Sequence, residues 1–152
     1  MQNTVYIRSI GPNHNAVNAA MIEFATQGYK SVGIVVHKMD PGLAIFENDP
    51  LFVKELKKGV TAKKNGIEYR SLSSFQIKKG KMFENVDAIL CLFVSEELLR
   101  EVQNKYKGNI VYIPWNMYED EAMEQQGIKC IYEAPEYRSS LASCMRFSTI
   151  YQ

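Results

Sequence analysis

The sequence has few of the residue types from which disulfide frameworks and metal sites are built. Its three cysteines, Cys91, Cys130 and Cys144, are odd in number, lie far apart and form no Cys-x-x-Cys pair. This spacing predicts neither a disulfide framework nor a zinc site. His14 and His37 are the only two histidines, and a metal site would need a third ligand, for which Asp40 is the nearest candidate. We expect no bound metal.

Long hydrophobic runs and an excess of charge are also lacking. No apolar run approaches the roughly 20 residues that a membrane-spanning helix needs, and the first four residues lack the basic and apolar regions of a signal peptide. The net charge is +1, which provides no general attraction toward nucleic acids or membranes. We therefore expect a cytoplasmic protein without a membrane partner.

What the chain does contain is a regular alternation of apolar runs and helix-like segments. At 152 residues, with 46% hydrophobic and 23% charged residues, it has the composition of one ordinary globular domain, 1–152, with 134–152 as a helical or extended tail. The alternation predicts a three-layer Rossmann-like (doubly wound) α/β fold, with a mostly parallel sheet of five to six strands in the order 3-2-1-4-5 and an edge strand. The expected strands are 5–10, 31–38, 67–72, 86–93, 109–114 and 128–132.

Helix boundaries are marked by capping signals. An i, i+3, i+4 apolar stripe predicts a helix over 16–27. The pair Asp49-Pro50 is typical of a helix start, and we expect this helix to end at Asn65-Gly66. Ser95, followed by two glutamates, predicts the start of another helix. The segment 73–85 shows no clear pattern.

The fold class indicates where a ligand would bind. In an open parallel sheet, ligands bind outside the carboxyl ends of the strands, where the strand order reverses. This rule selects four loops, and the predicted strand order brings the first and the third of them together. The loops are 11–15, 37–42, 94–96 and 114–117.

The first loop runs from the first strand into the first helix and contains Gly11, Asn13, His14 and Asn15. Unpaired amides at a helix N-terminus, together with amide and imidazole side chains, suit a phosphate, a carboxylate or a ribose. The loop has neither the Walker spacing nor the three glycines of a dinucleotide fingerprint. The alternative is an ordinary turn in which an asparagine caps the helix.

The other three loops contribute His37, Ser95, Glu96, Trp115 and Asn116 as candidate binding residues. A pair of loop histidines suits acid–base chemistry near neutral pH, a carboxylate can bind a ribose, and an aromatic ring can stack on a base. Each has a structural alternative: a solvent-exposed histidine, a serine cap followed by dipole-favoured acids, or an aromatic cover for the core. No complete catalytic constellation is present.

Charge is distributed unevenly along the chain. Only two acids, Glu55 and Glu68, interrupt a basic section, which favours phosphate contacts, although lysines opposite an apolar helix face are usually its solvated side. The basic residues are Lys54, Lys57, Lys58, Lys63, Lys64, Arg70, Lys78, Lys79 and Lys81.

Two stretches, the opening Gly-Pro turn and the strand–helix unit 86–97, resemble the broad Rossmann-like group, including nucleoside deoxyribosyltransferase-like domains. Those domains also have a Gly-Pro turn after the first strand and an acid after a central strand. Because the likeness covers only these stretches, it assigns no family and no catalytic residue.

The sequence thus leads to three functional hypotheses. The first is binding of a nucleotide or a phosphorylated metabolite, with an unknown cofactor, at the carboxyl edge of the sheet. The second is a non-catalytic regulatory module that self-associates, for example as a homodimer, through its tail or its charged faces. The third is nucleic-acid binding through the basic section 54–81.

Overall fold

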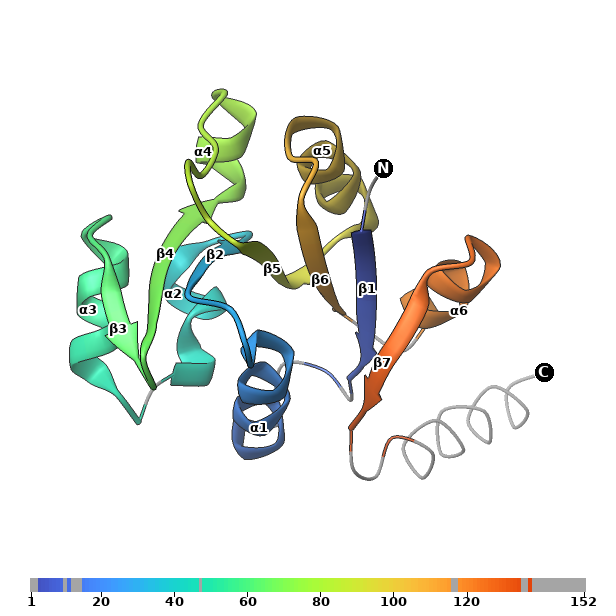
Figure 1. Ribbon diagram of the computed structural model, residues 1–152, viewed down its shortest axis with the longest axis horizontal. Helices are drawn as coiled ribbons and strands as arrows, with labels where there is room; N and C mark the ends of the chain where they lie inside the picture. Colours follow the sequence, from blue (N-terminus) through green and yellow to red (C-terminus); the bar gives the residue numbers. More distant parts are fainter. Residues whose placement is uncertain are drawn as a thin grey trace.

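A seven-stranded β-sheet forms the centre of the part of the chain that the computed structural model describes (Figure 1), which comprises residues 3–9, 11, 15–46, 48–115, 118–134 and 137. The predicted tail helix lies outside this part, apart from Ala134 and Tyr137. The elements follow along the chain as β1 (Asn3–Arg8), α1 (Asn15–Thr26), β2 (Ser31–Val36), α2 (Met39–Gly42), the 3₁₀ helix η1 (Ala44–Phe46), α3 (Pro50–Lys57), β3 (Ala62–Lys64), β4 (Ile67–Ser73), α4 (Ser74–Lys78), β5 (Ala88–Val94), α5 (Glu96–Lys105), β6 (Asn109–Pro114), α6 (Tyr118–Gln125) and β7 (Lys129–Glu133).

The sheet is mixed. Its order is β3-β4-β2-β5-β6-β1-β7, and β3 runs antiparallel to β4 while the other neighbouring strands pair in parallel. The predicted α/β class is confirmed. The predicted five to six strands are wrong, because the described residues form seven and one of them is antiparallel.

The predicted strand order is also wrong, because β1 lies between β6 and β7 rather than beside β2 and β5. Tyr6 pairs with Tyr112 on one side and with Cys130 on the other. A strand with an apolar sequence can pair with any two other apolar strands. The burial pattern of β1 therefore predicts a central strand without specifying which strands flank it.

The pair Asn65-Gly66 does not end a helix, as predicted, but forms the turn of a β3–β4 hairpin. Both residues have positive φ angles, 53° and 78°, the backbone of the two-residue turns that join antiparallel strands. Helix α3 ends earlier, at Lys57. The Asn-Gly dipeptide was the signal for this hairpin, and its short first strand, with two lysines in three residues, gave no apolar run.

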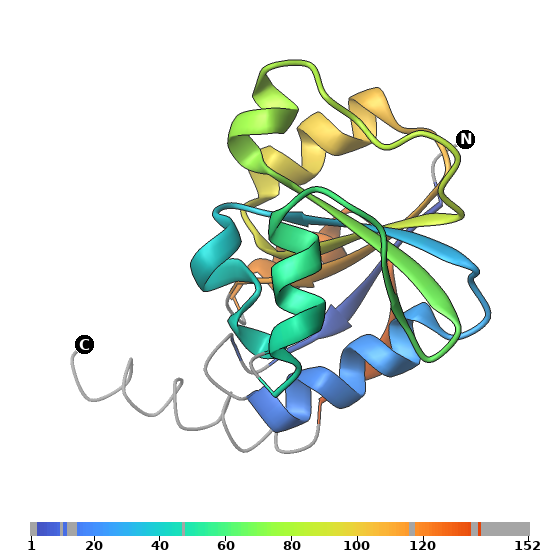
Figure 2. The ribbon, with the colours of Figure 1, turned by 90° about the vertical axis from the view of Figure 1, so that its left-hand side faces the viewer.

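Helices cover both faces of the sheet. Figure 2 shows α4 and α5 on one side and α1 on the other. Side chains of the strands alternate accordingly: Ile34 and Val36 pack in the cluster that includes α1, η1 and α3, whereas Val35 packs in the cluster beneath α4, α5 and α6. The sheet therefore has a hydrophobic core on each face.

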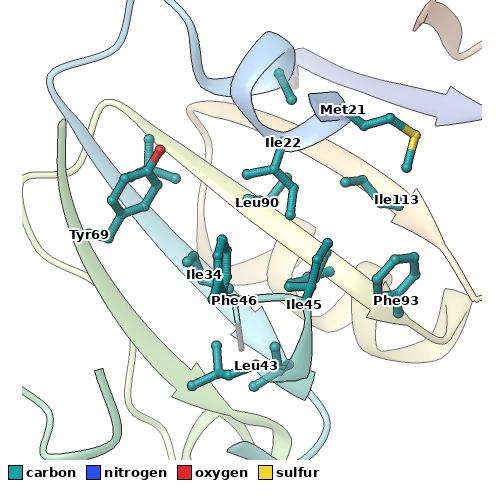
Figure 3. Packing of buried hydrophobic residues seen from close by; sticks show 14 of the residues in the cluster. Met21, Ile22, Ile34, Leu43, Ile45, Phe46, Tyr69, Leu90, Phe93 and Ile113 are labelled. Atoms are coloured by element: carbon teal, nitrogen blue, oxygen red, sulfur yellow. The ribbon is translucent and has the colours of Figure 1, made fainter. Parts of the chain in front are cut away.

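The core under α1 is the larger of the two (Figure 3). Met21 and Ile22 of α1 share it with Leu90 and Ile113 of the central strands. At the β4 side it is extended by three aromatic rings in edge-to-face contact, with centroids 5.1 and 5.5 Å apart. These rings belong to Phe46, Phe52 and Tyr69.

The helix starts follow the capping signals. The Asp49 carboxylate accepts the Phe52 N–H at 3.3 Å, which confirms the predicted start of α3. In the segment without a clear pattern, Ser73 and Gln76 form a reciprocal capping box that starts α4. A serine followed three residues later by glutamine is a recognised start signal, so this helix was readable from the sequence.

We expect Gly33→Ala to destabilise the fold. A Cβ atom at Gly33 in β2 would lie 2.6 Å from Cγ of the buried Phe83 ring, so the ring would have to shift. Overpacking of this kind costs about 1–3 kcal/mol of the free energy of unfolding, which urea denaturation measures.

The matched control places Gly33→Ala in a Phe83→Leu background. The smaller side chain leaves room for the added methyl group, so the cost of the glycine substitution should fall. An equal cost in both backgrounds would show that the Phe83 ring does not set the size limit at Gly33.

Candidate functional site

The parallel strands place the four candidate loops at one edge of the sheet. The chain leaves β2 toward β4, but it leaves the adjacent β5 in the opposite direction, toward β6. It likewise leaves β6 toward β7 and the adjacent β1 toward β2. Such reversals mark the ligand positions of open α/β sheets. We call the β2/β5 reversal, with His37 and Ser95, the first switch point, and the β6/β1 reversal, with Gly11 and Trp115, the second.

At the first switch point, two predicted residues make direct contact. The Ser95 backbone N–H donates to Nε2 of the exposed His37 imidazole at 3.0 Å. An accepting Nε2 belongs to a neutral ring whose proton is on Nδ1, so the other ring nitrogen is a donor. The His37 carbonyl accepts from the Ser74 N–H at 3.3 Å and the Ser74 hydroxyl at 3.0 Å. These bonds connect the ends of β4, β2 and β5.

Beside this contact lies an unusual backbone conformation. Phe93 has φ 53°, a left-handed conformation that is rare for a bulky side chain. The β5–β6 register shifts between Leu92 and Val94 at the same place. Bulges of this kind redirect the end of a strand and are frequent next to functional sites.

Ser95 and Glu96 have structural contacts as well. The Ser95 hydroxyl accepts the Leu98 N–H at 3.2 Å and caps α5, as predicted. The Glu96 carboxylate accepts from Arg100 at 2.6 Å and from Gln126 at 3.0 Å. It therefore connects α5 with α6.

At the second switch point, the predicted Gly11 and Trp115 come close together. Gly11 has φ 101°, and a Cβ atom on it would lie 3.9 Å from the Trp115 carbonyl oxygen. The Trp115 side chain is 53% exposed. Ser9 Oγ accepts the Gly11 N–H at 3.0 Å, and the buried Asn18 Nδ2 donates to the Gly11 carbonyl at 2.9 Å. These bonds hold the turn that precedes α1.

A buried polar atom lies directly beneath this turn. Asn18 Oδ1 is buried and has no hydrogen-bond partner among the residues that the structure describes, although nearly all such groups in folded proteins have one. Asn15 is the first residue of α1, and the first turn of this helix contains no acid. The predicted residues Asn13, His14 and Asn116 lie outside the described part of the chain.

The loop pairing differs from the expectation. We expected the first loop to meet the third, but β1 does not lie next to β5. The second loop meets the third through His37 and Ser95, and the first meets the fourth through Gly11 and Trp115. The histidine pair proposed from the sequence is not tested, because His14 is one of the residues outside the described part.

Sequence reasoning missed the residue that connects the two switch points, Tyr112 of β6. Its hydroxyl is buried 2.9 Å from the carbonyl of Val94 and 2.6 Å from Oε2 of Glu119. The same carboxylate oxygen accepts the Trp115 N–H at 3.2 Å. Burial, followed by the contact with Glu119, raises the pKa of Tyr112 well above its usual value. The hydroxyl therefore keeps its proton.

A second missed feature is a buried carboxyl group in the first turn of α6. Asp120 is 3% exposed, and its Oδ2 accepts the Tyr137 hydroxyl at 2.8 Å, while Oδ1 has no partner among the described residues. Burial raises the pKa of Asp120 to about 7, although the Tyr137 hydrogen bond and the nearby Arg8 lower it in part. The spacing of Asp120 from the buried Met123, three residues on, was the available signal.

Arg8, at the end of β1, lies within the same group of side chains. Its guanidinium pairs with Glu124 of α6 and, at 3.2 Å, with Glu133 of β7, and it lies 6.0 Å from the centre of the Tyr137 ring. The Ala134 N–H also donates to the Arg8 carbonyl at 2.8 Å. Through these contacts, Arg8 binds Ala134 and Tyr137, which follow β7, to the end of β1.

Comparisons with known proteins add no assignment. No protein-family model, no curated protein and no solved structure matches this chain. Within the described ranges, no three His, Cys, Asp or Glu side chains are grouped so that they could hold a metal ion. None of the described helices has the length and apolar character needed to cross a membrane.

We expect Asp120→Asn to change how stability depends on pH. Because the pKa of Asp120 is raised in the folded state, this carboxyl group keeps its proton up to a higher pH than in the unfolded chain, where the pKa of aspartate is near 3.9. The free energy of unfolding of the wild type should thus fall from about pH 4 to pH 7, by up to about 1.4 kcal/mol per unit. The uncharged variant avoids this loss and should be more stable by about 2–4 kcal/mol at pH 8.

Denaturant titrations at a series of pH values measure this difference. Glu121→Gln, which removes an exposed acid one residue along the same helix, is the matched control and should follow the wild-type curve. If the stability of Asp120→Asn ran parallel to that of the wild type across this range, Asp120 would not carry the proton.

Proposed function

We propose that this protein binds a nucleotide or another phosphorylated small molecule at the carboxyl edge of the sheet, across both switch points. The observation that carries the proposal is the convergence of the predicted loops in pairs, His37 with Ser95 and Gly11 with Trp115, where the strand order reverses. The strands β2, β5, β6 and β1 are consecutive in the sheet, so the outer two are about 14 Å apart. A ligand with two chemically different ends can bridge that span.

The phosphate end is assigned to the start of α1. The first amides of a helix have no intrahelical partner and attract an anion, and the first turn of α1 carries no acid. Helix α5 begins at the same edge but has Glu96 and Glu97 in its first turn, which oppose a bound anion. Asn18 Oδ1, which has no partner among the described residues, can accept a hydrogen bond from a hydroxyl or amino group of the ligand next to the phosphate.

The remaining part of the ligand is assigned to Trp115 and His37. An indole that is about half exposed beside a strand end offers a face for stacking a base. The Nδ1–H of His37, which is left free to donate when Nε2 accepts from Ser95, suits an oxygen or nitrogen acceptor on the ligand. The phosphate and the base thus both lie at the second switch point, and His37 at the first binds a further polar group of the ligand.

The nucleic-acid alternative has less support, because part of its charge is already neutralised. Three lysines of the basic section form ion pairs with carboxylates. These pairs are Lys57 with Asp40, Lys63 with Glu68, and Lys64 with Asp49.

The test is a thermal-shift screen with nucleotides, nucleosides and sugar phosphates, followed by calorimetric titration of any compound that raises the melting temperature. We expect Trp115→Ala to weaken binding about tenfold, because an aromatic–base stack is lost. His37→Ala should weaken it about threefold to tenfold, as expected for one hydrogen bond.

Phe24→Ala is the matched control, because Phe24 is another exposed aromatic, near the end of α1 that is remote from both switch points, where its ring contacts Tyr132. It should leave the affinity unchanged. A screen in which no compound raises the melting temperature of the folded protein would contradict the proposal and favour the self-associating module. So would a hit whose affinity does not change in Trp115→Ala and His37→Ala.

A further inference from the structure

A groove outside both switch points lies between α2, η1 and α3. It has a volume of about 530 Å³, within the range of small-molecule sites. Its floor includes the fully buried Leu43, and its wall includes the partly buried Val53. Its lining comprises Asp40, Leu43, Ala44, Pro50, Val53, Lys54, Lys57 and Lys58.

The charged groups around this groove are mainly positive. Lys54, Lys57 and Lys58 are spaced i, i+3 and i+4 and therefore share one side of α3. Among the lining residues that the structure describes, Asp40 is the only acid. Within the described part of the chain, Lys54 and Lys58 form no ion pair. The described lining, with three lysines and one aspartate, thus carries two positive charges in excess.

The dipole of α3 favours cations in its last turn and so accounts for lysines at these positions. It does not account for the hollow with an apolar floor beside them. Three ammonium groups next to one another repel, and an anion placed among them relieves this repulsion. An anion with a small carbon skeleton would use both the charge and the apolar floor.

The protein itself already places one anionic group against these lysines. Asp40 Oδ1 lies 2.5 Å from Lys57 Nζ, although the Asp40 side chain is 86% exposed. The hydrogen bond and the charge of Lys57 lower the pKa of Asp40. The Asp40 carboxylate occupies the position that an oxygen atom of a bound anion would take on Lys57.

We propose that the α2–α3 groove is a second binding site, which takes the phosphate group of a ligand. Lys54 and Lys58 bind its oxygen atoms, and Lys57 joins them when the phosphate displaces Asp40. The carbon skeleton of the ligand packs on Leu43 and Val53. The site is independent of the one proposed at the switch points, because it shares no residue with it.

The test is a titration of the whole protein with inorganic pyrophosphate at low salt, followed through the backbone amide signals of Leu43, Ala44 and Lys57 by NMR. The double variant Lys54→Gln/Lys58→Gln should weaken binding about threefold to tenfold. Asp40→Asn removes the competing carboxylate and should strengthen binding about twofold to fivefold. A loss of affinity in Asp40→Asn would overturn the displacement.

The matched control is Lys78→Gln/Lys81→Gln, which removes the same charge from an exposed region outside the groove. It should leave the affinity for pyrophosphate unchanged. Equal weakening by the two double variants would show that pyrophosphate senses only the overall charge, and this would overturn the proposal. Amide shifts at Leu43, Ala44 and Lys57 without shifts at Gly11 and Asn18 separate this site from the phosphate position proposed at the start of α1.

A second titration, with a single-stranded oligonucleotide, distinguishes the sources of the phosphate. Binding of pyrophosphate alone supports a phosphorylated small molecule. Binding of the oligonucleotide alone, with the same dependence on Lys54 and Lys58 and a steep dependence on salt, supports the nucleic-acid backbone as the source. Absence of binding in both titrations would overturn the site.

Discussion

The insertion of β1 between β6 and β7 is the constraint on which this side of the sheet depends. It pairs Asn3 with Asn109 and Val5 with Lys129, more than a hundred residues away along the chain. Closing loops of that length costs conformational entropy before the contacts between the strands can stabilise the fold. Burial of Tyr6 and Ile7 on opposite faces, together with the Arg8 ion pairs, offsets this cost. The insertion also creates the second switch point, because it brings the end of β1 next to the end of β6.

The sequence predicted those features that depend on neighbouring residues. The range of β6 agrees with the predicted 109–114. Asp49 and Ser95 cap their helices as expected, because a cap needs only residues within one turn. The Asn-Gly hairpin was also a local signal, but it was assigned to the end of a helix. The strand order could not be obtained in this way. The strands β2, β5 and β6 are apolar on both faces and so fit more than one pair of neighbours.

In the candidate site, too, some features depend on neighbouring residues and others depend on the strand order. That His37, Ser95 and Trp115 would lie at one edge follows from the parallel arrangement alone, but which of them meet depends on the strand order. The buried acid Asp120 and the hydroxyl of Tyr112 were missed for a related reason. An aspartate in the first turn of a helix normally faces solvent and favours the helix dipole. Only the packing of α6 against β1 and Tyr137 makes this one a buried group with a raised pKa.

Tyr112 gives the two switch points a common support. Its hydroxyl lies within hydrogen-bond distance of Val94, next to the residue that contacts His37, and of Glu119, which also holds the backbone of Trp115. One hydroxyl proton can be directed fully toward only one of these two acceptors. A shift of the Val94 carbonyl or of the Glu119 carboxylate would therefore change the hydrogen bond that the Tyr112 hydroxyl makes to the other. Because the residue is fully buried and packed, it holds the end of β5 in a fixed position relative to the backbone at Trp115 that follows β6.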